Sequence, residues 1–318
     1  MPQGASTTQP DARRRGNLAC SSTREAAATG SAVERATAEV FAALAGGATV
    51  AVCCERTTES VLAAVGVTYL AHAEPHRVRL VATDEAQVRI GEKIVTFEDG
   101  DDDSVVALAK RVFTGFEKRC GTICARRVVL ACASDESGMP EIVHRYLRLG
   151  FSEGKRLYED VAAPEALAFA KLAQRVSSEC EHTRQFVRFA RLPDGTFVSV
   201  FEPNENTLPL VGTHFARRMR EDRFVVVDPG HLVAIFHEPS DATCAVVGLD
   251  EDTAATLAAR VDETDERERL VQALWQRFYR AMELPGRGAA GRGYDLRASW
   301  MPKRFWHGLP ELNTALRG

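Results

Sequence analysis

The stretch FEPNENTLPLVGTHFARR, Phe201–Arg218, lies at the centre of the fold that the sequence predicts. Two apolar, aromatic runs come before it, Phe186–Leu192 and Thr196–Phe201. The tripeptide Pro193-Asp194-Gly195 separates these runs and is typical of a hairpin turn. The sequence therefore predicts a β-hairpin that leads directly into the quoted stretch.

A helix signal and a group of polar residues share this stretch. Pro209 suits the first turn of a helix, which Asn206 or Thr207 would cap. A helix start beside polar side chains is a common place for a ligand or catalytic site. Alternatively, these side chains only satisfy backbone donors at a structural elbow. The candidate catalytic residues of the elbow are Glu202, Asn206, His214 and Arg217.

The composition is that of a soluble globular protein. The 318 residues are 45% hydrophobic and 26% charged, and this length allows two domains of ordinary size. The formal net charge of −4 gives no global basic field, although a local basic patch is enough to bind nucleic acid. No apolar run is long enough to predict a membrane span.

Neither the cysteines nor the N-terminal segment indicates a metal site or secretion. The eight cysteines form no CxxC pair, and Arg127 occupies the position where a third cysteine would follow Cys120 and Cys124 in a radical SAM motif. We therefore predict reduced thiols, no metal, no cofactor and a cytoplasmic protein. Residues 1–30 predict a disordered tail, with an organellar transit peptide as the alternative. A eukaryotic source would leave organelle and nucleus open as compartments.

The order of predicted elements indicates the α+β class. Short apolar runs alternate with helical spacing in residues 31–136, which predicts an N-terminal α/β domain. Residues 137–318 predict a helical region and then an antiparallel sheet with flanking helices. The last long helix is expected from Asp262 to Glu283 and should bury Leu270, Leu274, Phe278 and Ala281.

Basic side chains recur at helical spacing after residue 140. They are candidates for phosphate contact, and the aromatic residues near the C-terminus are candidates for stacking on bases. The alternatives are solvated helix faces and a C-terminal arm that packs on the core. The candidate nucleic-acid-binding residues are Arg145, Arg148, Lys155, Arg156, Lys171, Arg175, Trp300, Lys303, Arg304 and Trp306.

Five ordered motifs resemble those of an uncharacterised, mainly bacterial family labelled "probable DNA metabolism protein". They are RYLRLGF (Arg145–Phe151), FVRF (Phe186–Phe189), EPNENTLPLVGTHFARR (Glu202–Arg218), LWQRFYRAM (Leu274–Met282) and WMPKRFWHGLPEL (Trp300–Leu312). Members of that family are encoded beside a radical SAM protein thought to modify or repair DNA, and some are fused to a uracil-DNA-glycosylase-like domain. This chain departs from the family at Cys54-Glu55-Arg56, where a Tyr-Asp-Gly turn is usual, and it contains no glycosylase motif.

Three functions follow as hypotheses. The resemblance and the basic residues predict a nucleic-acid-binding accessory factor in DNA repair or modification, with DNA and a radical SAM or uracil-DNA-glycosylase-like protein as partners. The first alternative is an enzyme that acts on a nucleotide or damaged base through Glu202, His214 and Arg217. The second is a protein-interaction scaffold, which would show a large exposed apolar patch.

Overall fold

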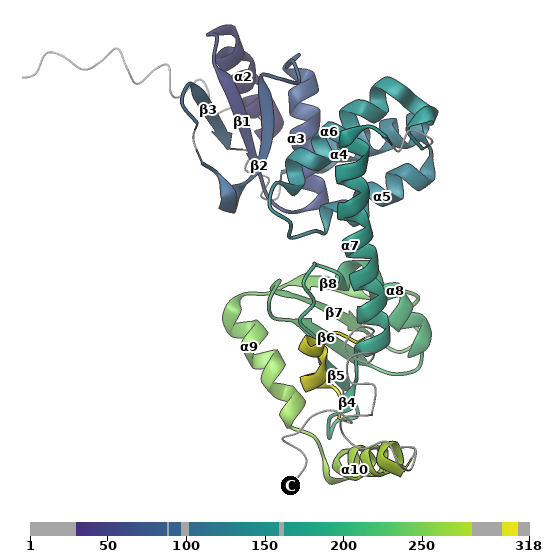
Figure 1. Ribbon diagram of the computed structural model, residues 1–318. Helices are drawn as coiled ribbons and strands as arrows, with labels where there is room; N and C mark the ends of the chain where they lie inside the picture. The colour runs from purple at the N-terminus through teal and green to yellow at the C-terminus, as the bar shows by residue number, and fades with distance from the viewer. Residues whose placement is uncertain (1–29, 88, 97–101, 159–161, 282–300, 311–318) are drawn as a thin grey trace, which may run out of the picture.

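The computed structural model describes residues 30–87, 89–96, 102–158, 162–281 and 301–310. The predicted tail before Gly30 and the candidate Trp300 lie outside the described residues. Figure 1 shows two lobes that one long helix, α7 (Pro164–Phe186), connects. The predicted α+β class is confirmed, because the chain combines a parallel sheet, a mixed sheet and many helices.

The N-terminal lobe is built on a three-stranded parallel sheet. Its strands are β1 (Thr49–Cys54), β2 (Val78–Ala82) and β3 (Glu92–Thr96), in the order β2-β1-β3. Helix α3 (Thr58–Leu70) makes the crossover that parallel strands require. This helix is apolar and buried on almost every side, because it lies between the sheet and the outer helices.

The outer helices complete the first hydrophobic core. They are α2 (Ala32–Ala45), α4 (Asp103–Cys120), α5 (Thr122–Cys132) and α6 (Met139–Glu153), and the short 3-10 helix η2 (Gly154–Tyr158) follows α6. All of them contribute buried side chains to this core. The predicted domain boundary after residue 136 lies between α5 and α6, two helices that share the same core.

Helix α7 belongs to both lobes. Phe169 and Leu172, in its first half, lie in the first core, whereas Val176 and Cys180 lie in a second core. The helix continues beyond Cys180 to Phe186, where the chain turns towards β4. Because one continuous helix crosses from core to core, the lobes share a rigid backbone element.

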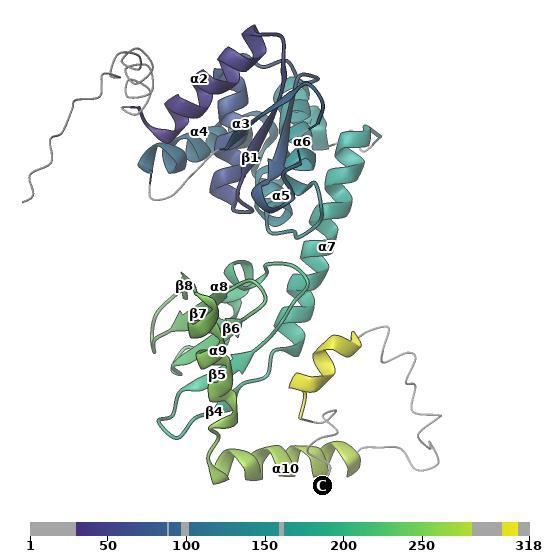
Figure 2. The same ribbon diagram turned by 90° about the vertical axis from the view of Figure 1, so that its left-hand side faces the viewer.

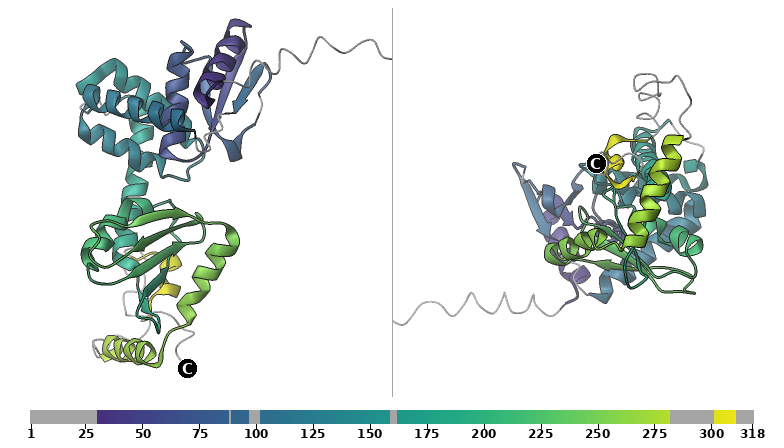
Figure 3. Two further views of the ribbon diagram at one scale, coloured as in Figure 1. Left: turned by 180° about the vertical axis from the view of Figure 1, so that it is seen from behind. Right: turned by 90° about the horizontal axis from the view of Figure 1, so that it is seen from below.

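The C-terminal lobe contains a sheet that Figure 3 (left) shows from behind. This sheet is mixed and five-stranded, with the order β4-β5-β6-β7-β8. The strands are β4 (Ala190–Arg191), β5 (Phe197–Val200), β6 (Phe224–Asp228), β7 (Val233–His237) and β8 (Ala245–Gly248). The expectation of a purely antiparallel sheet is wrong at one place, because β5 and β6 pair in parallel. Helix α8 (Leu208–Arg218) is the crossover between them and carries the chain back to the same end of the sheet.

Helix α8 buries Leu208, Val211 and Phe215 completely, whereas Leu210 is only partly buried. The predicted cap is absent, because the Thr207 side chain makes no capping hydrogen bond. Its hydroxyl instead lies 2.8 Å from that of Thr183 on α7, and both threonines are fully buried. This pair therefore fixes the start of α8 against the long helix.

Three further helices follow the sheet. They are α9 (Glu251–Ala259), which the sequence did not predict, α10 (Glu266–Ala281) and the short 3-10 helix η5 (Lys303–Gly308). The predicted inward face of α10 is wrong, because Leu270, Leu274 and Phe278 are exposed. The less exposed stripe of α10 is polar and consists of Glu268, Gln272 and Gln276.

Candidate functional site

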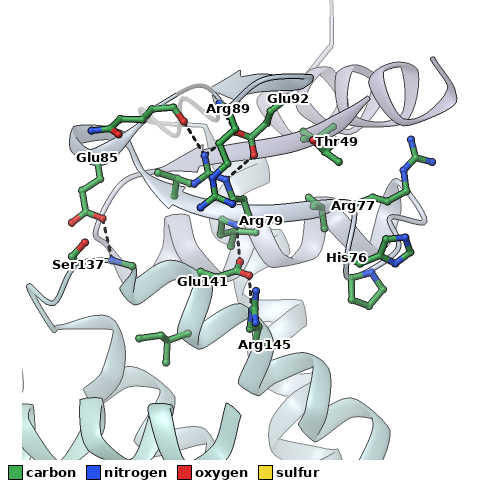
Figure 4. A pocket seen from close by; sticks show the side chains of 18 of the residues that line it. Thr49, His76, Arg77, Arg79, Glu85, Arg89, Glu92, Ser137, Glu141 and Arg145 are labelled. Carbon is green, nitrogen blue, oxygen red and sulfur yellow. Dashed lines mark hydrogen bonds and ion pairs between the residues drawn. The ribbon is translucent and has the colours of Figure 1, made fainter. Parts of the chain in front are cut away.

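The N-terminal lobe contains an open cavity of about 980 Å³ beside β2 (Figure 4). Its walls come from β2 and the residues before it, from the segment between β2 and β3, and from the first turns of α6. The lining includes many titratable or charged side chains: His76, Arg77, Arg79, Asp84, Glu85, Arg89, Glu92, Glu141 and Arg145. A cavity of this size with convergent charged groups is the best candidate for a ligand site among the described residues.

An ion pair between Arg79 and Glu92 lies across one face of the parallel sheet. Arg79 is on β2, Glu92 is on β3, and Ala51 on the intervening β1 is the register partner of Arg79. The guanidinium donates to both carboxylate oxygens of Glu92 at 2.7 and 2.8 Å. The hydrogen bond from Arg79 is the main reason that the pKa of Glu92 lies below its ordinary value. The charges of Arg79 and Glu92 therefore balance each other, and the pair forms part of the cavity wall.

Glu141, in the first turn of α6, closes the outer edge of β2. Its carboxylate accepts the backbone N–H of Leu80 at 2.9 Å, so a backbone donor of the edge strand is satisfied. It also accepts Nε of Arg145 at 2.7 Å and lies 3.3 Å from Nδ1 of His144. Burial opposes ionisation of Glu141, but these hydrogen bonds outweigh it and lower its pKa. Glu141 is therefore a charged structural link that also holds Arg145 at the cavity.

The remaining cavity arginines differ in how far their charge is already satisfied. Arg77 donates to the backbone carbonyls of Leu44 and Ala48 at 2.7 and 2.8 Å. Arg89 is exposed, and within the described residues its guanidinium makes no hydrogen bond or ion pair. Arg145 is paired with Glu141, yet its side chain is 63% exposed. Arg89 and Arg145 are therefore the two cavity arginines most available to an anionic ligand.

The structure does not assemble the predicted catalytic elbow. Glu202 and His214 are both exposed and share no hydrogen bond. Partial burial, with Arg184 and Arg218 nearby, lowers the pKa of His214. Arg217 is exposed in the last turn of α8. His214 and Arg217 share an exposed face of α8 because they are three residues apart, but no hydrogen bond among the described residues connects them to Glu202 or Asn206.

Instead, the elbow joins the two lobes through Glu205, a residue that the sequence analysis did not select. Its buried carboxylate accepts the Ser134 hydroxyl at 2.9 Å and the Asp135 backbone N–H at 2.8 Å. Arg175 donates to the same carboxylate at 2.9 Å and also pairs with Glu136. Two carboxylates of this chain, the buried Glu205 and the partly exposed Glu136, already pair with Arg175, so this candidate for phosphate contact is part of the lobe joint.

Asn206 contributes to the same joint through its backbone. Its N–H donates to the Ala133 carbonyl at 3.0 Å, so the elbow is tied to the loop that follows α5. The side-chain oxygen of Asn206 is buried and has no hydrogen-bond partner among the described residues. The second candidate of the elbow therefore has a structural position between the lobes rather than a place in a pocket with His214.

His231 makes a second link between the lobes. Its Nδ1 lies 2.6 Å from a carboxylate oxygen of Asp228 at the end of β6, and its Nε2 lies 2.9 Å from Asp135 in the loop after α5. Burial alone would lower the pKa of His231, but the hydrogen bonds to Asp135 and Asp228 raise it to about 10. The imidazole is therefore positively charged at neutral pH and bridges two carboxylates. The only sequence signal was its place after Pro229-Gly230, a turn typical of a hairpin.

Four other basic candidates lie on the helices. One of them bonds to the protein itself, and the other three are exposed. Arg148 donates to the Ala73 carbonyl at 2.8 Å and lies over the ring of Tyr69. The exposed side chains are those of Lys155, Arg156 and Lys171, which form no ion pair within the described part of the chain. Arg148 therefore differs from its sequence neighbours, because its guanidinium packs on the first core.

The C-terminal arm packs mainly through Phe305 and Leu309, which are buried. Phe305 stacks on Phe201 with ring centroids 4.7 Å apart. Arg304 donates to the buried carboxylate of Glu179 at 2.6 Å, and the indole N–H of Trp306 donates to the Met301 carbonyl at 3.0 Å. Lys303 is exposed. Arg304 therefore has a structural partner, and its replacement would not be a clean test of nucleic-acid binding.

The fold and the cavity define a two-lobed α+β protein with a charged ligand-site candidate in its N-terminal lobe. The chain belongs to the family described as a domain of unknown function, DUF4130, whose model matches residues 137–311. No curated protein matches the chain. No helix among the described residues has the length and apolarity needed to cross a membrane.

One solved structure with a detectable likeness is RecJ in complex with Mn²⁺ from Thermus thermophilus. The TM-score is 0.31 and the identity is 11%, over 85% of this chain and 60% of that chain. This chain thus spans less than two thirds of the RecJ chain, and the likeness is too weak to support an argument. In the described part of the chain, no group of three or more His, Cys, Asp or Glu side chains could hold a metal ion.

Proposed function

We propose that the protein is a nucleic-acid-binding accessory factor in DNA repair or modification, and that the cavity of its N-terminal lobe contacts phosphate. The observation that carries the proposal is the position of Arg89 and Arg145 at one open cavity. Arg89 comes from the segment between β2 and β3, whereas Arg145 comes from α6. Two exposed guanidinium groups from separate elements supply the charge and the hydrogen-bond donors that phosphate groups require.

The architecture of the cavity favours a phosphate chain over a single small anion. The cavity is open and about 980 Å³ in volume, which is large enough for a nucleotide unit. Its carboxylates at Glu92 and Glu141 are already bound by Arg79, Arg145 and backbone donors. Those at Asp84 and Glu85 pair with Arg56. Their negative charge is therefore largely balanced within the wall, and Arg89 adds positive charge that lacks an ion-pair partner in the described part of the chain.

The context of DNA repair rests on the sequence resemblance, and so do the proposed partners. The motifs that carry it fall within or next to the matched family region, residues 137–311. A radical SAM protein or a uracil-DNA-glycosylase-like protein would perform the chemistry, and this protein would hold the nucleic acid. The exposed Lys155, Arg156 and Lys171 would add phosphate contacts on the helical side of the lobe.

The test compares DNA binding of the wild type and the double variant Arg89→Ala/Arg145→Ala across a salt series. If the two side chains contact phosphate, the slope of log affinity against log salt becomes shallower by about two. The matched control is Lys110→Ala/Lys118→Ala, which removes two exposed positive charges from α4 outside the cavity. Fluorescence anisotropy with single- and double-stranded DNA provides the affinities.

Two outcomes would refute the proposal. Absence of salt-dependent DNA binding by the wild type would remove the nucleic-acid function. An unchanged slope in the cavity variant would remove the cavity from the binding site. Thermal unfolding of the variant serves as the folding control, since Glu141 retains its hydrogen bonds to Leu80 and His144 when Arg145 is replaced.

A further inference from the structure

Helices α3 and α4 pack against each other in the N-terminal lobe (Figure 2). An open groove of about 350 Å³ lies between them and shares no lining residue with the charged cavity beside β2. Its large apolar lining residues are Tyr69, Leu70, Leu108, Val112 and Phe151. The rings of Tyr69 and Phe151 meet edge to face with centroids 5.5 Å apart, so an aromatic wall closes one part of the groove.

Gly115, in the interior of α4, also lines the groove. A glycine inside a helix is destabilising relative to alanine, so its presence needs a reason. Close packing does not supply one, because a Cβ at this position would lie 3.7 Å from the nearest atom, on the Phe151 ring, which is an ordinary van der Waals distance. At Gly66 on α3, by contrast, a Cβ would come within 2.6 Å of Leu108. Packing therefore requires the glycine at position 66, whereas the glycine at position 115 keeps the groove open.

The charges beside the groove are positive. Of its lining residues in the described part of the chain, Arg111 alone is charged. Arg111 precedes Gly115 by about one helical turn, and Lys118 follows Gly115 on the same face of α4. Both side chains are exposed, and neither forms an ion pair with a described residue. The guanidinium of Arg148 lies over the Tyr69 ring, 4.7 Å from its centroid. The groove thus combines apolar walls with a positive rim.

We propose that this groove binds a small amphipathic carboxylate, whose apolar chain or ring lies against Val112 and Phe151 and whose carboxylate meets Arg111. The volume supports a small molecule, since ligand pockets begin at about 300 Å³. The guanidinium of arginine binds a carboxylate through two parallel hydrogen bonds. The eight lining residues are far fewer than the roughly 20–30 residues that each side of a stable protein interface contributes.

The first experiment titrates the full chain with octanoate and with octanamide by isothermal calorimetry. The two probes have the same alkyl chain, but only octanoate is charged. We expect octanoate to bind about tenfold more tightly than octanamide, and Arg111→Ala should remove most of this difference. The matched control is Lys110→Ala, which removes an exposed positive charge from the neighbouring position of α4 outside the groove and should keep the preference.

The second experiment fills the groove. Gly115→Leu should abolish binding of both probes, whereas Gly115→Ala adds only a Cβ that fits and should retain binding. Both variants gain the same freedom from an interior glycine, so the melting temperature of neither should fall below that of the wild type. If Gly115→Leu fails to fold, the comparison of Arg111→Ala with Lys110→Ala still decides the proposal, because both side chains are exposed.

Four outcomes would overturn the proposal. Octanoate that binds Gly115→Leu as tightly as the wild type would place the ligand outside the groove. A wild type that binds neither probe at up to about 10 mM would remove the site. Equal affinities for the two probes would remove the carboxylate from the proposed ligand class. A wild type that ignores octanoate but forms dimers, which Gly115→Leu dissociates, would assign the groove to a second copy of this chain. None of these results depends on nucleic-acid binding.

Discussion

Replacement of the charged link between the lobes, His231→Gln, should destabilise the protein strongly at neutral pH and hardly at all at high pH. The imidazole is 11% exposed and lies between the fully buried carboxylate of Asp228 and the half-exposed carboxylate of Asp135. Glutamine keeps a polar group of similar length but carries no charge. The variant therefore removes the electrostatic part of the link and leaves the packing largely in place.

The magnitude follows from the pKa of His231. A rise from 6.5 to about 10 corresponds to roughly 4–5 kcal/mol of preferential stabilisation of the charged form. Because the Asp135 side chain is 50% exposed, solvent screens part of this interaction. We therefore expect the free energy of unfolding to fall by about 2–3 kcal/mol in His231→Gln near neutral pH.

The sign of the pH dependence is fixed by the direction of the shift. The folded state holds its proton more tightly than the unfolded state, so the stabilisation is complete below about pH 6.5. It is lost as the pH rises towards about 10, where the folded imidazole also loses its proton. The difference between wild type and variant should therefore be largest at about pH 6 and should nearly vanish above about pH 10.

Urea unfolding followed by tryptophan fluorescence provides the assay. The chain has three tryptophans, Trp275, Trp300 and Trp306, and all of them come after the last strand of the C-terminal sheet in the sequence. The control is His76→Gln, which removes an exposed histidine whose partner Glu74 is also exposed and should therefore change little. A destabilisation of equal size at both ends of the pH range would refute the electrostatic reasoning. No destabilisation at any pH would show that the link does not contribute to folding.

Two pairs of core substitutions test the packing of the C-terminal lobe. Leu208→Ala should lower the free energy of unfolding by about 3 kcal/mol and Leu210→Ala by about 1 kcal/mol, because only Leu208 is fully buried. Equal effects of the two substitutions in urea unfolding would contradict this order. Phe305→Ala should lower the free energy of unfolding by about 3 kcal/mol, since it removes a buried ring that is stacked on Phe201. Trp306→Ala should lower it less, because Trp306 is only half-buried. A reversed order of melting temperatures would show that Trp306 anchors the arm.

Local sequence patterns were sufficient to predict most elements of this protein. Ser31 and Glu34 form a capping box at the start of α2, where the sequence has helical spacing. The alternation of apolar runs and helical spacing predicted the α+β class, and Pro209 marked the beginning of α8. These features depend on side chains within a few residues of each other, so their physical causes are present in any short stretch of the chain.

The assembly of the lobes and of the cavity depended on tertiary structure. Apart from the contact between His231 and nearby Asp228, Glu205 and His231 form ion pairs or hydrogen bonds with partners 30 to 96 positions away. No local pattern predicts which side chain a buried carboxylate will meet. Arg89 and Arg145 likewise line the same cavity only because β2, the segment that follows it and α6 pack together. The outward apolar face of α10 shows the same limit. Periodicity identified the amphipathic helix, but only the tertiary structure showed that its apolar face is exposed and its polar stripe less so.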